Sequence, residues 1–372
     1  MKQGAPPALR FLEEALSEAS RQHLLRDRPP PRRPDGLSFC SNDYLGLASR
    51  PAAPAPAGSG ASRLVSGERA EHTALEAAVA DLVQLPSALV FSSGYAANVG
   101  LMSSLPRAGD LVVSDALNHA SLIDGMRLSR CRVAVVPHLD LGAVEAALQD
   151  RGPGRAFVVT ESYFSMDADS PDLPALRALC DRHGAALVVD EAHAVGVLGP
   201  GGAGLCAEQG VVPDALVGTF GKAFGAAGAF VAGCEALTQW LWNSARSFVF
   251  STGMSPVVAA AALEGIRMAT GEPLRRERTL AVAAQLRRGL RALGVEPLGF
   301  GYIVPWVVGE PKAAVDLAAG LVAAGFDVRA IRPPSVPKGT ARLRLTVTAA
   351  HSSGDVERFL SAAARLVAPE TR

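Results

Sequence analysis

The stretch that decides the fold runs from Ala186 to Gly225 and reads ALVVDEAHAVGVLGPGGAGLCAEQGVVPDALVGTFGKAFG. It contains two short apolar runs, Ala186–Asp190 and Ala215–Gly218, and polar side chains follow directly at the end of each run. Asp190 closes the first run, and Lys222 comes shortly after the second. In open α/β sheets, ligands bind beyond the carboxyl ends of the strands. We therefore expect these two side chains to reach one site.

The same alternation of short apolar runs and helical patterns fills the first two thirds of the chain. The helical patterns include Leu75–Val83, Leu141–Leu148 and Leu173–Cys180. Strands that alternate with helices predict an α/β fold with a mostly parallel sheet covered on both faces. The strands expected besides the two above are Ala88–Phe91, Leu111–Val113, Arg132–Val136 and Ala156–Thr160.

The two ends of the chain have a different character. Residues 8–26 read as an amphipathic helix that the segment Arg28–Pro34 would break, and Pro51–Gly60 reads as a loop. We expect three parts: an N-terminal helix and arm (1–45), a large domain (46–250) and a small C-terminal α+β domain (251–372). The helices expected in the last part are Pro256–Met268, Leu274–Leu293 and Ala313–Ala324, and the strands are Tyr302–Val308 and Ala341–Thr348.

The composition excludes several classes of protein. Of 372 residues, 49% are hydrophobic and 19% charged, which is ordinary for a globular chain and excludes a disordered or collagenous one. The 36 basic residues balance 36 acidic ones, so we expect no general attraction to nucleic acid or to a membrane surface. Five scattered cysteines without a C-x-x-C pair predict neither a disulfide framework nor a metal site. No signal peptide and no membrane-spanning run is recognisable, so we expect a cytoplasmic protein.

Lys222 has an unusual setting for a lysine. The chain has few lysines, and this one alone is flanked by phenylalanines and glycines, in the segment Gly218–Gly225. Apolar surroundings disfavour the ammonium form and leave the amine free to act as a nucleophile or a base. A surface lysine on a flexible turn is the alternative, and the local sequence leaves both interpretations open.

The residues from Asp190 to His193 spell DEAH, a motif of helicase-type ATPases. Such an ATPase needs a P-loop ahead of this strand, but the only Gly-Lys pair lies downstream, at Lys222, and no Ser or Thr follows it. Pyridoxal 5′-phosphate fits better, since its ring nitrogen needs an acidic partner and its aldehyde needs a lysine. His193 would then donate to the phenolate oxygen of the ring. Taken singly, each residue is better explained structurally, Asp190 as a helix N-cap and His193 as a buried histidine with its hydrogen bonds satisfied.

Four further features carry weaker signals. His119 follows an expected strand and would suit stacking on a ring, although a lone loop histidine is more often structural. Ser92–Asn98 joins a strand to a helix and would suit phosphate binding by backbone N–H groups. Gly58–Gly67 is rich in glycine but lacks the dinucleotide spacing G-x-G-x-x-G. Arg342 and Arg344 share one face of a strand, which is usually a solvated face.

Taken together, the motifs resemble one family, the α-oxoamine synthases. The resemblance runs from Leu16 to the C-terminus and implies the aspartate aminotransferase fold (fold type I), pyridoxal 5′-phosphate as cofactor, and a homodimer that completes the site across its interface. The matching segments, in family order and spacing, are Asn118–Leu122 (NHASL), Thr160–Asp169 (TESYFSMDAD), Asp190–His193 (DEAH) and Thr219–Gly225 (TFGKAFG).

The resemblance implies a role for each residue around the cofactor ring. Lys222 would bind the aldehyde of the cofactor covalently and then act as the base for the α-proton. Asp190 would pair with the ring nitrogen, and His119 would stack on the ring. His193 and Ser165 would contact the ring oxygen.

The phosphate and the substrates are assigned in the same way. The backbone of Gly94 and Tyr95 and the hydroxyl of Thr219 would hold the phosphate, and Thr252 would reach it from the second subunit. The two arginines expected at the substrates are Arg344, for the carboxylate of the amino acid, and Arg26, on the N-terminal helix, for the far carboxylate of an acyl chain.

Within the family, the segment Ala330–His351 looks like the member that serves biotin biosynthesis. The implied reaction condenses L-alanine with a pimeloyl thioester, either pimeloyl-CoA or pimeloyl-acyl carrier protein, with loss of carbon dioxide and the free thiol carrier. A sister enzyme that uses glycine or serine with a different acyl-CoA is the alternative. A binding protein without catalysis is a third, against which the joint presence of Lys222, Asp190, His193 and His119 argues. Arg63 stands where the family pattern has glycine, which affects the expected entry of the acyl chain.

Overall fold

A seven-stranded sheet with the order β2-β8-β7-β6-β5-β3-β4 forms the centre of the protein. The structure is a computed structural model, and it describes residues 7–26, 37–51 and 54–367. Neighbouring strands run parallel except at β8, which is antiparallel to both β2 and β7. The strands are β2 (Ser87–Phe91), β3 (Leu111–Asp115), β4 (Arg132–Val136), β5 (Ala156–Glu161), β6 (Ala185–Asp190), β7 (Ala215–Thr219) and β8 (Ala229–Gly233).

Both faces of this sheet are buried, as the sequence predicts. Along β3, Leu111 and Val113 pack into one apolar cluster and Val112 into another. Along β5, Val158 belongs to the first cluster and Phe157 to the second. Because successive side chains of a strand point to opposite faces, helices must cover the sheet on both sides.

The expected strands of the large sheet are all present, but β8 escapes the sequence analysis. Its sequence, AFVAG, has a single β-branched residue, Val231, and follows a glycine-rich turn. Its position between β2 and β7 makes the sheet mixed rather than wholly parallel. β8 runs antiparallel to its neighbour β7, so the two strands are joined by a connection at the carboxyl end of β7. Lys222 lies in that connection.

The expected helices are present with small shifts at their ends. Among the described residues, no helix combines the length and the apolar character that crossing a membrane requires. The helices are α1 (Arg10–Arg21), α2 (Ala70–Val83), α3 (Gly94–Ser104), α4 (Ala120–Ser129), α5 (Leu141–Gln149), α6 (Leu173–His183), α7 (Leu205–Glu208), α8 (Glu235–Ser244), α9 (Arg246–Val249), α10 (Pro256–Gly271), α11 (Pro273–Ala292), α12 (Pro311–Ala323) and α13 (Ser353–Val367).

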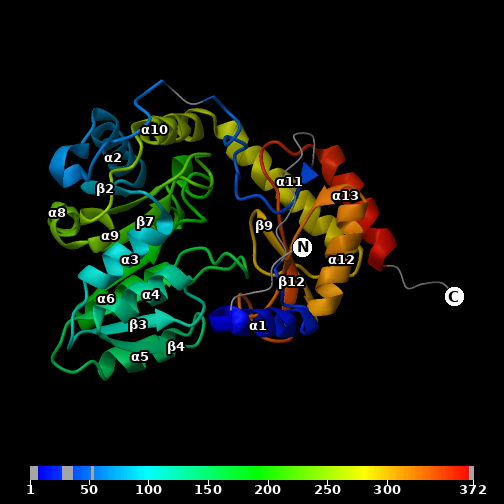
Figure 1. The fold of residues 1–372 in the computed structure, drawn as a ribbon, viewed down its shortest axis with the longest axis horizontal. Coiled ribbons are helices and arrows are strands. Elements are labelled where there is room, and N and C mark those ends of the chain that lie inside the picture. Colours follow the sequence, from blue (N-terminus) through cyan, green and yellow to red (C-terminus); the bar gives the residue numbers. More distant parts are fainter. Residues whose placement is uncertain (1–6, 27–36, 52–53, 368–372) are drawn as a thin grey trace.

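Two smaller sheets complete the fold. One is antiparallel with the order β11-β12-β9, and the other pairs β1 with β10 in parallel. Figure 1 shows β9 and β12 grouped with α11, α12 and α13, apart from the large sheet. The boundaries near residues 45 and 250 stay a prediction. The strands are β1 (Leu37–Ser38), β9 (Ile303–Gly309), β10 (Phe326–Asp327), β11 (Ala330–Ile331) and β12 (Ala341–Thr346).

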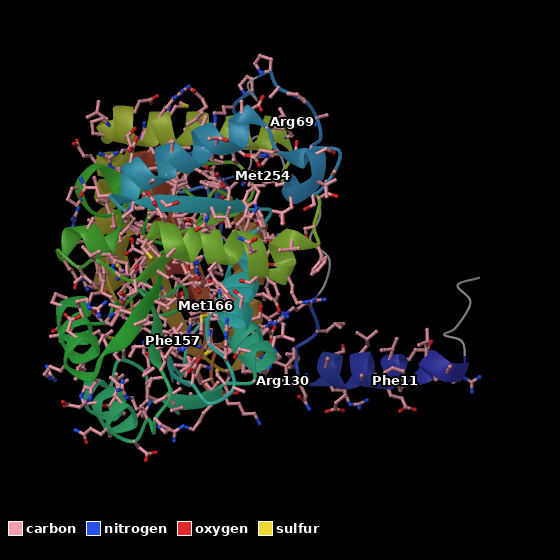
Figure 2. The ribbon with its side chains drawn as sticks, turned by 90° about the vertical axis from the view of Figure 1, so that its left-hand side faces the viewer. Phe11, Arg69, Arg130, Phe157, Met166 and Met254 are labelled. Atoms are coloured by element: carbon pink, nitrogen blue, oxygen red, sulfur yellow. The ribbon has the colours of Figure 1, made fainter. Side chains whose placement is uncertain are left out.

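The N-terminal helix is shorter than the sequence predicts. The chain makes a 3₁₀ turn at Pro7–Leu9, and α1 ends at Arg21, because His23 adopts a left-handed backbone conformation. Arg26 therefore lies beyond the helix and not on it, which corrects the expectation above. No residue of α1 is buried, and Figure 2 shows the helix, with Phe11, projecting from the body of the protein. The segment expected to break the helix, Arg28–Pro34, lies outside the described residues.

Candidate active site

The carboxyl ends of three neighbouring strands bring the predicted side chains together. β6 lies between β5 and β7 in the sheet, and Glu161 at the end of β5 pairs in register with Asp190 at the end of β6. The chain leaves β7 at Thr219 and reaches Lys222 within the following turn. Asp190 and Lys222 thus meet at one edge of the sheet, because their strands are neighbours and parallel.

The surroundings of Lys222 suit an amine that must lose its proton. Burial lowers the pKa of Lys222 to about 8, against the opposing influence of the Asp190 and Glu161 carboxyls, while the Arg344 guanidinium adds to the decrease. Phe220 and Phe224, which flank the lysine, are fully buried. About a tenth of the amine is therefore neutral at pH 7, far more than at the ordinary pKa of a lysine, and the neutral form is the one that a nucleophile or base requires.

Asp190 is held by two hydrogen bonds that leave it able to accept another. Its Oδ1 accepts from the backbone N–H of Ala192 at 2.8 Å, and its Oδ2 accepts from Nδ2 of Asn98 at 2.7 Å. The sequence analysis gave Asn98 no role, although the residue closes the Ser92–Asn98 motif. Its position in the sequence could have indicated a role. A side chain one turn after the start of α3 points back toward the N-terminus of the helix, where the phosphate was predicted.

His119 is oriented by the same network. Its Nδ1 lies 2.7 Å from the hydroxyl of Ser121 and 3.2 Å from the backbone nitrogen of that residue. The Ser121 hydroxyl also accepts from Nδ2 of Asn98 at 3.0 Å. Asn98 thus ties the imidazole of His119 to the carboxylate of Asp190, so the groups predicted for the face and the nitrogen of one ring are fixed relative to each other.

A cavity of about 500 Å³ has His119 on its wall, whereas Lys222 and Asp190 are not among its lining residues. Three segments form its wall: residues 116–120 and 123 around His119, residues 161 and 164–167 at and after the end of β5, and residues 334–337 of the C-terminal part. Glu161 and Ser165 are both on this wall. The volume lies within the range of small-molecule sites, and the wall combines a few polar groups with apolar ones.

The N-terminus of α3 lies next to β7, where the phosphate was predicted. A Cβ placed on Gly94 would be 3.9 Å from Oγ1 of Thr219, so this hydroxyl borders the first turn of the helix. Ser93 caps the helix, since its Oγ accepts from the N–H of Ala96 at 3.1 Å. The amides of Gly94 and Tyr95 precede that bond and have no helical partner, which makes this end a suitable anion site.

Thr252 lies outside this group in the single chain. It is exposed and lines a small separate cavity with Ser92 and Arg63. Its predicted contact with the phosphate of a second subunit stays a prediction.

His193 is buried and held from two sides. Its Nδ1 lies 2.7 Å from the hydroxyl of Tyr44, and the Tyr302 hydroxyl donates to its backbone oxygen. Burial and the charges of Lys222 and Arg344 lower the pKa of His193 well below its usual value, so the ring is neutral. The sequence analysis did not single out Tyr44 or Tyr302. Neither belongs to a local motif, and only the fold brings them to the histidine.

Arg342 and Arg344 do not form a solvated face, contrary to the simplest interpretation of their spacing. Both are buried on β12, with 2% and 7% of their surface exposed. Nη1 of Arg342 contacts the Asp167 carboxylate at 2.7 Å, while Nε of Arg344 donates to the backbone oxygen of Ser165 at 2.5 Å. This strand of the small sheet therefore reaches the loop that carries Ser165.

Arg26 reaches the cavity wall from outside the helix. Its Nη2 donates to the hydroxyl of Ser335 at 3.0 Å, and Ser335 lines the same cavity as His119. Arg332 fixes this part of the N-terminal segment, because its guanidinium donates to the backbone oxygens of His23 and Leu25. A guanidinium thus stands at the wall segment formed by residues 334–337, and its contact with the carboxylate of an acyl chain stays a prediction.

Arg63 turns away from the cavity. Its guanidinium lies between the carboxylates of Glu68 and Glu76, and it faces the rings of Trp242 and Phe248 at 5.1 and 5.5 Å. Only 3% of its side chain is exposed. The arginine that replaces glycine in this loop therefore fills an internal position and does not block the space next to His119.

Glu161, in the Thr160–Asp169 segment, is a further acidic group to which the sequence analysis gave no role. It is buried, with 5% of its surface exposed, and lies on the cavity wall. Burial and the neighbouring Asp190 carboxylate raise the pKa of Glu161 well above its usual value, against the charge of Lys222. Two adjacent buried carboxyls do not both ionise easily, so Glu161 favours its protonated form.

These residues fit pyridoxal 5′-phosphate. The donor set contains an amine that loses its proton readily, a hydrogen-bonded carboxylate, an imidazole on the cavity wall, and a helix N-terminus beside a threonine hydroxyl. Each matches one group of the cofactor: the aldehyde, the ring nitrogen, the ring face and the phosphate.

Comparisons with known proteins agree with this cofactor. Residues 34–362 match the family model described as aminotransferase class I and II. The chain is 43% identical to "8-amino-7-oxononanoate synthase 1" of Polaromonas sp., over 95% of both chains. It is 47% identical to the 8-amino-7-oxononanoate synthase of Geobacter sulfurreducens, over 88% of both chains.

Solved structures of the same fold are also similar. A serine palmitoyltransferase of S. paucimobilis with bound PLP and myriocin matches with a TM-score of 0.88 and 26% identity, over 98% of both chains. The 8-amino-7-oxononanoate synthase of Francisella tularensis matches with a TM-score of 0.74 and 25% identity, over 90% of this chain and 98% of the other. Fold type I and the cofactor are common to these relatives and this chain.

Proposed function

Because the chain belongs to the aminotransferase class I and II family and, within it, to the 8-amino-7-oxononanoate synthases, we propose that it condenses L-alanine with a pimeloyl thioester. The products are 8-amino-7-oxononanoate, carbon dioxide and the free thiol carrier, which places the enzyme in biotin biosynthesis. The observation that carries the proposal is the near-complete match to these synthases, at 43% identity over 95% of both chains.

The amino-acid end of the reaction depends on Lys222, Asp190 and Arg344. When bound, pyridoxal phosphate supplies an aldehyde for the amino group of alanine and a ring that accepts electrons from the α-carbon. The Asp190 carboxylate would keep a proton on the ring nitrogen, which strengthens that acceptance. Arg344 would pair with the alanine carboxylate, and the lowered pKa of Lys222 lets its amine take the α-proton at neutral pH.

The acyl end depends on the cavity and on Arg26. A pimeloyl chain ends in a carboxylate, and a guanidinium is a suitable partner for that group. Arg26 donates to Ser335, which belongs to the same cavity wall as His119. An acyl chain that enters beside residues 334–337 would have its carboxylate near Arg26 and its thioester near Lys222.

We propose a homodimer for this enzyme, as the family resemblance implies. Thr252 would complete the phosphate site of the neighbouring subunit. Its exposure on the single chain leaves its hydroxyl available for that contact.

A sister activity with serine is the second candidate, favoured by one observation. The serine palmitoyltransferase of S. paucimobilis has the higher TM-score of the two structures compared, 0.88 against 0.74. Against it, identity to that enzyme is 26%, whereas identity to the Polaromonas synthase is 43%. Arg26 would also have no carboxylate to bind on a palmitoyl chain.

The test is release of free thiol by the purified, cofactor-loaded protein. We would supply pimeloyl-CoA with alanine, glycine or serine in parallel and determine the product mass. Release with alanine alone, with the mass of 8-amino-7-oxononanoate, is the expected result. Preference for another amino acid would move the enzyme to a sister activity. If pimeloyl-CoA gives no release, the same assay with pimeloyl-acyl carrier protein decides between a carrier requirement and a wrong proposal.

A further inference from the structure

The hydroxyl of Tyr44 is the point where three polar groups of the candidate site meet. It lies 2.7 Å from Nδ1 of His193 and 3.1 Å from Oδ1 of Asn42, and it accepts from Nη2 of Arg344 at 3.2 Å. The Tyr44 side chain has no exposed surface. A single buried oxygen thus connects the arginine expected to bind the amino acid with the histidine expected to contact the cofactor.

Two acceptors compete for the single proton on this oxygen, Oδ1 of Asn42 and Nδ1 of His193. A phenol has one proton to donate, and a guanidinium is always a donor, so Arg344 occupies an acceptor position on the Tyr44 oxygen. Burial raises the pKa of Tyr44, against the charge of Arg344, and the hydroxyl keeps its proton. Asn42 Oδ1 already accepts from Nη1 of Arg344 at 2.9 Å. An amide oxygen can accept twice, so Asn42 stays a competitor and the distances decide. The hydroxyl lies 2.7 Å from Nδ1 of His193 and 3.1 Å from Oδ1 of Asn42, which makes Nδ1 the favoured acceptor of the Tyr44 proton.

That assignment fixes the proton of His193. The ring is neutral, because burial and the charges of Lys222, Arg344 and His119 lower its pKa. A neutral imidazole carries one N–H, and a nitrogen that accepts a hydrogen bond cannot hold it. With Nδ1 accepting from Tyr44, the proton is on Nε2. This is the form that can donate to an acceptor in the site.

We propose that Tyr44 is a positioning residue that holds His193 as the Nε2–H tautomer and links its hydrogen bond to Arg344. This inference rests on the proposed function, since it gives Arg344 and His193 their roles at the amino acid and at the cofactor ring. When Arg344 binds a carboxylate, the hydrogen bond from its Nη2 to Tyr44 changes in strength. The hydrogen bond from Tyr44 to His193 then changes as well. Linkage of this kind is reciprocal.

Tyr44 also has a packing role that must be separated from the role of its hydroxyl. Its ring contacts that of Tyr302 at a centroid distance of 4.5 Å. Its backbone oxygen accepts from the N–H of Ala349 at 2.9 Å and from the hydroxyl of Thr279 at 3.0 Å. Tyr44→Phe keeps the ring and the backbone and removes only the hydroxyl, so it tests the hydrogen bonds alone.

The experiment compares Tyr44→Phe with Tyr163→Phe as a matched control. Tyr163 is buried in the same aromatic cluster, 5.5 Å from Tyr302 between ring centroids, but its hydroxyl donates to the backbone oxygen of Phe300. Histidine-specific ¹⁵N spectra of the cofactor-free proteins report the tautomer of His193, identified by its loss in His193→Gln. We expect Nε2–H for the wild type and for Tyr163→Phe, and a changed Nδ1 signal for Tyr44→Phe.

The second measurement is a pH titration of the visible absorbance of the cofactor-loaded proteins, with and without alanine. We expect the midpoint of this absorbance titration to move by about half a pH unit or more in Tyr44→Phe. The reason is that the pKa behind the absorbance change depends on the groups around the cofactor ring. We also expect the dissociation constant of alanine to rise about tenfold, the fold-change for loss of a hydrogen bond to a charged group. Tyr163→Phe should match the wild type.

Unchanged His193 signals together with unchanged midpoints in Tyr44→Phe would overturn the proposal. If Tyr44→Phe fails to fold, the wild-type spectrum still decides, because a proton on Nδ1 of His193 contradicts it. Neither measurement needs an acyl donor or turnover. A negative thiol-release assay therefore bears on the proposed function alone, and the tautomer and the alanine linkage are judged separately.

Discussion

At the scale of single residues, we expect the largest loss of activity from substitution of Lys222. We expect Lys222→Ala to lose the visible absorbance of the lysine-bound cofactor and to reduce turnover by on the order of 10³-fold, because it removes both the covalent attachment and the base. Absorbance spectra and the thiol-release assay measure the two effects. Lys312→Ala is the control, since the side chain of Lys312 is 64% exposed and its ammonium pairs with Asp316 on the same helix. A coloured, fully active Lys222→Ala protein would contradict the site assignment.

His138 joins the two loops that carry His119 and Ser165. Its Nδ1 lies 2.8 Å from the carboxylate of Asp115, and its Nε2 lies 3.1 Å from that of Asp169. Asp115 also accepts from the backbone of Leu117, so it fixes the start of the first loop. Burial acts to lower the pKa of His138, but the hydrogen bonds and charges of the two aspartates raise it to about 10.

This raised pKa predicts a pH dependence of stability. The ordinary pKa of histidine, 6.5, is the value in the unfolded chain, so the pairing with Asp115 and Asp169 stabilises the fold fully below about pH 6.5. The stabilisation is lost as the pH rises toward about 10. We expect His138→Gln to cost about 1–3 kcal/mol at low pH and progressively less at high pH. Urea denaturation of both proteins at several pH values measures the difference, and a constant difference would contradict the assignment.

At the scale of elements, Arg63 fixes the turn Arg63–Gly67 against α2 and β2. Glu76 on α2 accepts from Arg63 and from the backbone N–H of Val90 on β2, and only 16% of its side chain is exposed. Arg63→Ala would leave this carboxylate buried without its cation. We expect a loss of about 3–5 kcal/mol in the free energy of unfolding.

The matched control for Arg63 is an exposed ion pair. Arg132 and Asp150 form such a pair, with 50% and 87% of their side chains exposed. We expect Arg132→Ala to cost at most about 1 kcal/mol. Arg63→Ala together with Glu76→Gln should regain part of the loss, because it neutralises the stranded carboxylate. Equal costs for the two arginine variants in urea denaturation would show that burial of the pair does not matter.

The elements differ in how far the sequence could predict them. The β6 and β7 regions were predictable because each combines an apolar run with a polar end, a local pattern that parallel strands repeat. β8 was missed because AFVAG has too few β-branched residues to stand out. The prediction that Arg26 lies on the N-terminal helix was wrong, because α1 already ends at Arg21. That end depends on the backbone conformation of His23 and not on apolar periodicity.

The site shows the same division. Lys222, Asp190 and His193 lie in short motifs, so the sequence could propose them and the order of the strands could bring them together. Tyr44 lies 149 positions from His193 along the chain, and no pattern within either segment points to the other. Contacts of this kind follow from the packing of the whole chain, which a single sequence does not encode locally.

At the scale of the whole molecule, the candidate site draws on distant parts of the chain. Asn42 and Tyr44 precede the large sheet, Lys222 follows β7, and Arg344 belongs to the small sheet. A cofactor bound at such a junction stabilises the folded state and not the unfolded chain. At 100 times its dissociation constant, the added stability is about 2.7 kcal/mol.

We therefore expect removal of pyridoxal phosphate to lower the Tm by several degrees, and re-addition to restore it. Lys222→Ala should show a smaller increase on addition, because its affinity lacks the covalent contribution. Differential scanning calorimetry with and without cofactor measures both. A Tm that does not respond to the cofactor in the wild-type protein would mean that the site does not join the parts of the chain as described.

The contacts between residues 332–335 and the segment after α1 have an evolutionary consequence. Arg332 contacts the backbone of His23 and Leu25, and Arg26 contacts Ser335, whereas no residue of α1 is buried. Mutations in this segment therefore escape the selection for stability that constrains the interior. A lineage could exchange Arg26 and its neighbours to accept acyl groups of another length or charge while the catalytic centre stays unchanged. The same scaffold could in this way give rise to enzymes with different acyl preferences.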